Sequence, residues 1–155
     1  MNSIEWLLEI PRRFGSREFL IDTQTGESVS FQGMHDAALH IGGDLRRRGL
    51  KKGDRVVMVL NNSAAFAKLY FGCLYAGIVA VPINPVLSKR EVEHIVTRCK
   101  ARLTVVSEET AYLVPTELAT QTGEVVLLDQ HGLIDATGEN AQNACSPEEL
   151  DDSSG

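Results

Sequence analysis

Apolar runs of strand length recur along this chain at residues 56–60, 78–81, 103–106 and 125–128, and only the third contains a polar residue, Thr104. A run without polar positions is typical of a strand covered on both faces, as in a parallel sheet. The second run is expected to be buried and to end at Pro82. Segments of helical spacing separate the runs, and such alternation implies right-handed crossovers. The chain is therefore predicted to have an α/β fold with a doubly wound, mostly parallel sheet and flanking helices.

The clearest helical pattern covers residues 32–48. One of its faces carries four apolar residues, Met34, Ala38, Ile41 and Leu45. Three further helices are predicted between the strands, at residues 64–76, 88–100 and 109–120. The first follows Asn61, Asn62 and Ser63, which can cap it, and turns inward Phe66, Leu69, Tyr70 and Cys73. The second opens with a capping box formed by Ser88 and Glu91.

Two further features of the 32–48 helix indicate what surrounds it. Gly42 and Gly43 each weaken a helix by about 1 kcal/mol relative to alanine, so we expect another segment to pack closely there. Arg46, Arg47 and Arg48 lie in the last turn, where cations interact favourably with the helix dipole. A solvated helix end explains these arginines, and a phosphate-binding patch is the alternative.

Both ends of the chain differ from this regular middle. Residues 19–22 and 28–31 are predicted strands that flank a turn with Gly26, so they form a hairpin. A short amphipathic helix capped by Asn2 is expected before the hairpin, ending ahead of Pro11. After Gln130 the apolar periodicity stops. We therefore predict one α/β unit over residues 1–129 and a polar, mobile tail over residues 130–155.

Charge and cysteine content exclude several classes of partner. The 155 residues include 15 Lys+Arg and 21 Asp+Glu, a formal charge of −6, which disfavours binding to nucleic acid or anionic membrane. Neither a signal peptide nor a membrane span is visible, so a cytoplasmic location is expected. Cys73, Cys99 and Cys145 match no metal-ligand spacing, which is typical of proteins in a reducing compartment.

Patterns that carry catalytic chemistry are scarce in this sequence. Residues 72–77 have the glycine spacing of a Walker phosphate loop, but Ile78 follows where lysine is required, and the segment ends a helix. The four histidines show no metal-ligand spacing, and no serine stands in a nucleophile elbow. No catalytic residue and no metal site are therefore assigned.

The carboxyl end of a central strand is the place where the expected fold points to a ligand. Asn61, Asn62 and Ser63 follow one strand and precede a helix, where anions and nucleotides commonly dock. Helix capping explains the same residues, so Asn62 and Ser63 are weak candidates for cofactor contact. The Pro-Ile-Asn-Pro link at residues 82–85 is interpreted as a structural turn, with a binding loop as the alternative.

Several segments, taken in order, resemble one known enzyme family. They are Gly-Asp-Arg-Val at 53–56, Asn-Ser at 62–63, residues 70–77, residues 82–85, Glu91, and Ala-Arg at 101–102. Their order and spacing resemble the N-terminal part of the adenylate-forming (AMP-binding) acyl-CoA synthetases. This superfamily of ligases includes 4-coumarate– and fatty-acid–CoA ligases, luciferases and peptide-synthetase adenylation domains. The similarity covers about residues 19–106, so the fold is expected to be an incomplete N-terminal portion of that synthetase fold.

The resemblance implies a reaction in which ATP activates a carboxylic acid to an acyl-adenylate, which then forms a thioester with CoA or a carrier pantetheine. ATP, Mg²⁺ and CoA are implied for the full-length family. Its phosphate loop, metal motif and catalytic lysine follow the matched region, so no cofactor is expected for this chain alone, and its status as an enzyme stays open. Residues 153–155 resemble the start of that loop, but residues 148–152, four of which are acidic, stand where the family has an apolar strand.

Three hypotheses follow for function. The chain is an N-terminal fragment of an AMP-forming carboxylate–CoA ligase, inactive alone, or it is a non-catalytic interaction module. The module would pair with the remainder of a split ligase or form a homodimer, because a sheet cut short leaves an edge and apolar faces to be covered. A third hypothesis is an independent nucleotide binder at the strand ends near Asn62. The carboxylic acid substrate belongs to the complete enzyme only.

Overall fold

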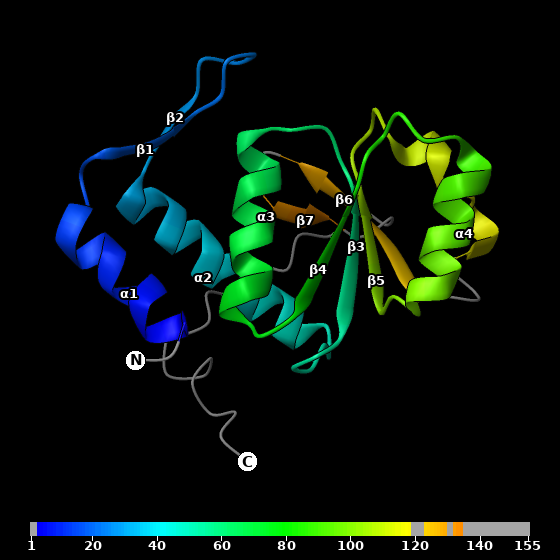
Figure 1. Ribbon diagram of the computed structural model, residues 1–155, viewed down its shortest axis with the longest axis horizontal. Helices are drawn as coiled ribbons and strands as arrows, with labels where there is room; N and C mark the ends of the chain where they lie inside the picture. The colour runs from blue at the N-terminus through cyan, green and yellow to red at the C-terminus, as the bar shows by residue number, and fades with distance from the viewer. Residues whose placement is uncertain (1–2, 119–122, 130–131, 135–155) are drawn as a thin grey trace.

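The computed structural model describes residues 3–118, 123–129 and 132–134 (Figure 1). Its main sheet has the strand order β4-β3-β5-β6-β7. The strands are β3 (Arg55–Val59), β4 (Val79–Ile83), β5 (Leu103–Val106), β6 (Glu124–Asp129) and β7 (Gly132–Ile134). The first four pair in parallel and β7 pairs antiparallel to β6. The predicted α/β fold with a mostly parallel sheet is confirmed.

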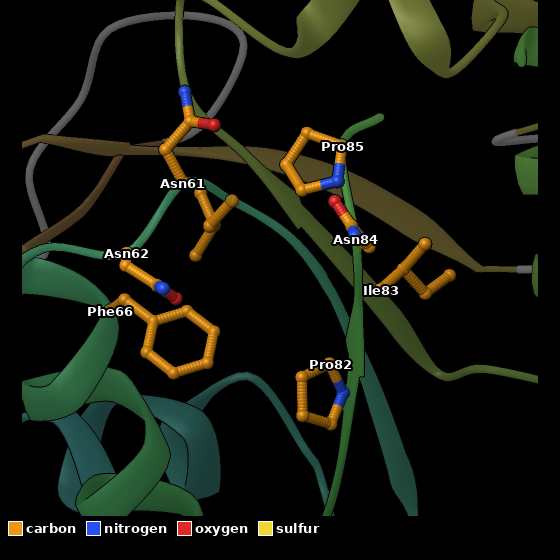
Figure 2. A pocket seen from close by; sticks show the side chains of 8 residues that line it. Asn61, Asn62, Phe66, Pro82, Ile83, Asn84 and Pro85 are labelled. Atoms are coloured by element: carbon orange, nitrogen blue, oxygen red, sulfur yellow. The ribbon is translucent and has the colours of Figure 1, made fainter. Parts of the chain in front are cut away.

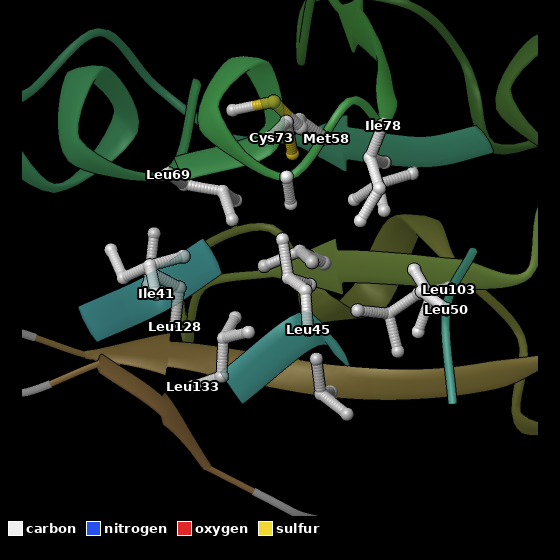
Figure 3. Close-up of a cluster of buried hydrophobic side chains, with 14 of the residues drawn as sticks. Ile41, Leu45, Leu50, Met58, Leu69, Cys73, Ile78, Leu103, Leu128 and Leu133 are labelled. Atoms are coloured by element: carbon white, nitrogen blue, oxygen red, sulfur yellow. The ribbon is translucent and has the colours of Figure 1, made fainter. Parts of the chain in front are cut away.

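Helices cover both faces of this sheet. They are α2 (Phe31–Arg47) and α3 (Ala64–Tyr75) on one face and α4 (Lys89–Cys99) on the other, while α1 (Ser3–Phe14) packs against α2. On one face, Met58 of β3 packs with Leu45 of α2 and Leu69 of α3, as Figure 3 shows. On the other face, Val57 packs with Val92 of α4. All five side chains are fully buried, because alternate residues of a central strand face opposite helix layers.

Helices α2 and α3 pack closely where glycines replace side chains. A Cβ atom added to Gly42 would lie 3.1 Å from the carbonyl oxygen of Gly72. A Cβ atom added to Gly72 would lie 2.6 Å from Cγ2 of Ile41, closer than real Cβ atoms approach. The expected close approach of a neighbour at Gly42 is confirmed, and the neighbour is α3.

The arginine triplet at the end of α2 is used within the fold. Nη2 of Arg46 donates to the carbonyl oxygen of Ala76, at 2.9 Å, just after α3. Arg47 and Arg48 pair with Asp44, at 3.6 Å and 3.3 Å. These contacts favour a structural role for the triplet over a phosphate-binding patch.

An antiparallel hairpin stands beside the main sheet. Its strands are β1 (Glu18–Ile21) and β2 (Ser28–Ser30), as the sequence predicts. Phe19 of the hairpin contacts Phe31 of α2 and Phe71 of α3, with ring centroids 4.9 Å and 5.6 Å apart. The hairpin is thereby held against the α2–α3 layer.

The structure corrects the prediction for the second strand, which was expected to be buried and to end at Pro82. β4 continues through Pro82 to Ile83, and among the described strands it pairs only with β3. It is an edge strand, and its Val79 is 46% exposed. The N–H of Val79 donates to the carbonyl of Asp54. Because successive backbone N–H groups of a strand point to opposite sides, the backbone nitrogen of residue 82 points away from β3. A proline there removes no ladder hydrogen bond.

The structure also corrects the prediction of a helix at residues 109–120, and the reason is again a proline. The structure has two short 3₁₀ turns instead, η1 (Ala111–Leu113) and η2 (Thr116–Leu118). Pro115 lies between them, and a proline disfavours helical geometry at the residue before it. Val114 accordingly takes an extended conformation, with φ −114° and ψ 105°.

The first helix departs from prediction in the opposite way, because α1 runs through Pro11 to Phe14. A proline inside a helix lacks the N–H that would bond the carbonyl four residues earlier, here that of Leu7. The hydroxyl of Tyr75 donates to this Leu7 carbonyl at 3.3 Å. Tyr75 also lies 2.9 Å from Nδ1 of His35. A side chain of α3 thus replaces the missing donor and fixes α1 to the domain.

One strand lies beyond the predicted boundary at Gln130. β7 pairs antiparallel with β6, and the N–H of Gly132 donates to Oδ1 of Asp129 at 2.9 Å. Leu133 is buried in the core, so β7 extends the α/β unit. The rest of the predicted tail, residues 130–131 and 135–155, lies outside the described residues, as does the predicted cap Asn2. In the part of the chain that the structure describes, no helix has the length and apolarity required to cross a membrane.

Candidate functional site

The segments that follow β3 and β4 line a cavity of about 330 Å³. Its walls are Leu60, Asn61, Asn62, Phe66, Pro82, Ile83, Asn84 and Pro85. Figure 2 shows Asn62 and Phe66 on one side, facing Pro82 and Asn84 across the opening. The two segments meet because neighbouring parallel strands bring their carboxyl ends to the same edge of the sheet, where open α/β sheets bind ligands.

Two of the three amide side chains in the cavity wall are held by neighbours. Nδ2 of Asn61 donates to Oε2 of Glu109 at 2.8 Å, and Oδ1 of Asn84 accepts from the N–H of Val86 at 3.0 Å. Asn62 is exposed beside them. The wall therefore offers a ligand the exposed amide of Asn62 and the aromatic ring of Phe66.

Ser63, the second candidate from the sequence, serves the helix instead. Its Oγ accepts from the N–H of Phe66 at 3.0 Å, which is an N-cap bond for α3. The N–H of Ala64 is taken as well, because it donates to Oδ2 of Asp22 at 3.1 Å. The start of α3 thus already holds a carboxylate of the chain itself, which leaves Asn62 as the candidate that lines the cavity.

Asp22 connects the hairpin to this edge of the sheet. Backbone N–H groups of Ala64, Thr25 and Gln24 donate to its carboxylate and hold the pKa of Asp22 below its ordinary value. The sequence placed Asp22 only at the end of a strand. Its spacing to Thr25 is typical of a local Asx turn, but the bond to Ala64 depends on the tertiary fold.

Replacing Asp22 with asparagine is expected to weaken the acid dependence of stability. The folded-state pKa is depressed, so the stabilisation is present above the unfolded pKa, near 4, and is lost as the pH falls through the folded value. Urea denaturation at pH 6 and pH 3 should show a smaller loss for Asp22→Asn than for the parent. The exposed Glu108→Gln serves as the control. Equal acid losses in the parent and Asp22→Asn would contradict this role.

Nucleophilic and metal chemistry find little support in the described residues. Burial raises the pKa of Cys73 to about 12, so this thiol stays protonated, as the packing interpretation of the sequence expects. Within residues 3–118, 123–129 and 132–134, no three His, Cys, Asp or Glu side chains gather as metal ligands would. The cavity wall also includes no lysine or arginine that could neutralise a triphosphate.

Comparison with known proteins identifies the family. The model of the family described as "AMP-binding enzyme" matches residues 7–154. This chain belongs to the AMP-binding enzyme family. The resemblance inferred from the order of the sequence motifs is confirmed.

Two curated relatives of this AMP-binding chain are CoA ligases. It is 34% identical over 138 residues to 4-coumarate–CoA ligase 3 of Oryza sativa subsp. japonica, an alignment covering 88% of this chain and 24% of that protein. It is 29% identical over 106 residues to the long-chain-fatty-acid–CoA ligase FadD13 of Mycobacterium tuberculosis, covering 68% and 21%. The chain thus spans about a quarter of the length of these curated relatives.

Solved structures agree on the fold. A benzoate CoA ligase from Burkholderia xenovorans LB400 superposes with a TM-score of 0.75 at 22% identity, over 97% of this chain and 28% of that one. The N-terminal domain of FACL13 from Mycobacterium tuberculosis gives a TM-score of 0.68 at 27% identity, over 73% and 29%. The AMP-binding chain therefore has the fold of a portion of these ligases.

Proposed function

We propose that this chain is the N-terminal part of an AMP-forming carboxylic acid–CoA ligase. The complete enzyme would form an acyl-adenylate from ATP and a carboxylic acid and then transfer the acyl group to CoA. The observation that carries the proposal is the family match over residues 7–154, together with relatives that are named as CoA ligases.

The cavity at the ends of β3 and β4 limits what this chain contributes to that reaction. Asn62 can donate or accept a hydrogen bond, and Phe66 offers an aromatic face to a flat ring. With no lysine or arginine in its wall, this cavity does not fit the triphosphate of ATP with its Mg²⁺ on its own. We therefore propose that ATP, Mg²⁺ and CoA bind only in the complete ligase, and that the chain alone is inactive.

A pair of measurements tests the proposed function. The purified chain is expected to give no hydroxamate with ATP, Mg²⁺, 4-coumarate and hydroxylamine. A hybrid in which this chain replaces the aligned part of rice 4-coumarate–CoA ligase 3 is expected to exchange pyrophosphate with ATP. The rice ligase without its aligned part is the control and should show no exchange. Hydroxamate formation by the chain alone, or a folded hybrid without exchange, would contradict the proposal.

The second candidate function is an interaction module that pairs with a partner chain supplying the rest of a ligase. It is favoured by the position of β4, whose outer edge no described strand covers. A stable hetero-complex or homodimer by light scattering would support this module. Calorimetric titration with ATP separates both candidates from an independent nucleotide binder, because only the binder would release or absorb heat.

A further inference from the structure

A second cavity, of about 130 Å³, lies between the first helix and the rest of the domain. Its walls come from α1, β1, α2 and α3, and Figure 1 shows α1 and the hairpin beside α2, away from the main sheet. We call it the α1 cavity, because Trp6, Leu7, Ile10 and Pro11 of α1 form one of its walls. It shares no lining residue with the cavity at the ends of β3 and β4, so it has no part in the proposed function.

Five aromatic side chains line the α1 cavity. Phe19 of the hairpin meets Phe31 of α2 at 58° and Phe71 of α3 at 77° between ring planes. Trp6 of α1 and Tyr75 of α3 complete the set. Tilted and edge-to-face contacts are the arrangements that aromatic rings prefer, so such a wall favours a flat aromatic ring as the ligand. The size also fits, since a cavity of roughly 150 Å³ is enough to hold benzene.

The α1 cavity is accessible from solvent. Trp6 is 58% exposed and Phe19 is 37% exposed, whereas Met34 in the wall is buried. A ligand can therefore enter without unfolding of the domain. It would also cover aromatic surface that now faces water, which favours binding.

The polar groups of the α1 cavity act as hydrogen-bond acceptors. The hydroxyl of Tyr75 has a single hydrogen, which it donates to the carbonyl of Leu7. It therefore accepts from the Nδ1–H of His35, at 2.9 Å, and Nε2 of the neutral imidazole carries no hydrogen. Nε2 has no hydrogen-bond partner among the described residues. Burial holds the pKa of His35 below its ordinary value, so the neutral form prevails at pH 7.

We propose that the α1 cavity binds a small, flat aromatic molecule that carries one hydroxyl or N–H donor, as phenols and indoles do. The ring lies among the aromatic side chains, and the donor bonds Nε2 of His35. Such a ligand touches α1 on one side and α2 and α3 on the other, so it binds only while α1 is docked. Its binding therefore stabilises the docked position of α1.

Trp6 reports on this binding, because it is the only tryptophan of the chain and lines the cavity. The purified chain is titrated with 4-methylphenol at pH 7, and a saturable change in the emission of Trp6 is expected. Ile10→Phe adds a ring at the cavity wall and should abolish this change. Ile21→Phe, at a hairpin residue that is 56% exposed and outside the cavity, is the matched control and should preserve it.

A second comparison tests the hydrogen bond to His35. Toluene has the same methyl-substituted ring as 4-methylphenol but no donor, and His35→Phe keeps a ring at position 35 but removes Nε2. Calorimetry with both probes should show that the preference for 4-methylphenol over toluene is about tenfold smaller in His35→Phe than in the parent, the effect of one hydrogen bond. A partial loss of folded protein would weaken both probes equally, so this ratio isolates the hydrogen bond.

The remaining outcomes overturn the proposal. Emission of Trp6 that does not saturate, or that changes equally in Ile10→Phe, would mean that no ligand enters the α1 cavity. An equal preference in the parent and His35→Phe would show a cavity for apolar rings that recognises no donor. Binding to the isolated chain that is lost in the folded rice hybrid would show that the rest of the ligase closes the cavity. None of these readouts uses the activity of the hybrid, so they stand apart from the test of the proposed function.

Discussion

Replacing Gly72 with valine is expected to lower the free energy of unfolding by about 2 to 3 kcal/mol, the cost typical of overpacking a core. Even one added carbon at this position would lie 2.6 Å from Cγ2 and 2.8 Å from Cβ of Ile41. Helix propensity favours valine over glycine by a few tenths of a kcal/mol, too little to offset the clash. Urea denaturation followed by circular dichroism measures the change.

Truncating the opposing side chain gives the control for this prediction. Ile41→Ala removes Cγ2, the nearer of the two Ile41 atoms that an added carbon would meet, keeps Cβ, and leaves a cavity of its own. The double variant should therefore be more stable than the sum of the two single changes predicts, by about 1 kcal/mol or more, as for residues in contact. Strict additivity would show that the α2–α3 contact does not limit the residue at position 72.

Replacing Leu69 with alanine is expected to cost about 3 kcal/mol, within the usual range for a buried leucine. Leu69 is fully buried in the cluster that joins α3 to Met58 and Leu45 (Figure 3). Alanine suits a helix, so the loss would come from packing alone. Guanidinium denaturation should show a lower midpoint with an unchanged slope, because the surface exposed on unfolding stays similar.

The neighbouring residue supplies the matched control for Leu69. Lys68 lies on the same helix, and its ion pair with Glu27 is partly exposed. Such pairs contribute about 1 kcal/mol or less, so Lys68→Ala should change stability little. Similar losses for Lys68→Ala and Leu69→Ala would contradict the assignment of the core to the Leu69 side of α3.

Elements that rest on local pattern could be predicted from the sequence. β3 was recognisable from an uninterrupted apolar run and β5 from a run broken only by Thr104, because such runs suit strands buried on both faces, and both strands are buried there. The start of α4 was recognisable because Ser88 and Glu91 form both bonds of a capping box in the structure. The break at Pro115 was also recognisable from the sequence, because a proline disfavours helical geometry at the residue before it. The helix predicted over residues 109–120 was wrong for this reason.

Elements that rest on distant partners could not be predicted. A proline predicts the end of a helix, yet α1 passes Pro11 because Tyr75, far along the chain, bonds the carbonyl of Leu7. β4 has the composition of a central strand, and its edge position depends on strand order, which local pattern does not contain. Chain order placed Asn62 at a strand end, whereas its meeting with Pro82 across the cavity depends on the tertiary fold.

The proline in β4 has a consequence for how this protein associates. An uncovered strand edge normally offers a row of amide donors on which another strand can grow, the first step of fibril formation. On the outer edge of β4, position 82 has no amide hydrogen, so Ala80 is the donor left between Val79 and Ile83. Recognition at this edge then depends more on side chains, and template-driven polymerisation along it is disfavoured.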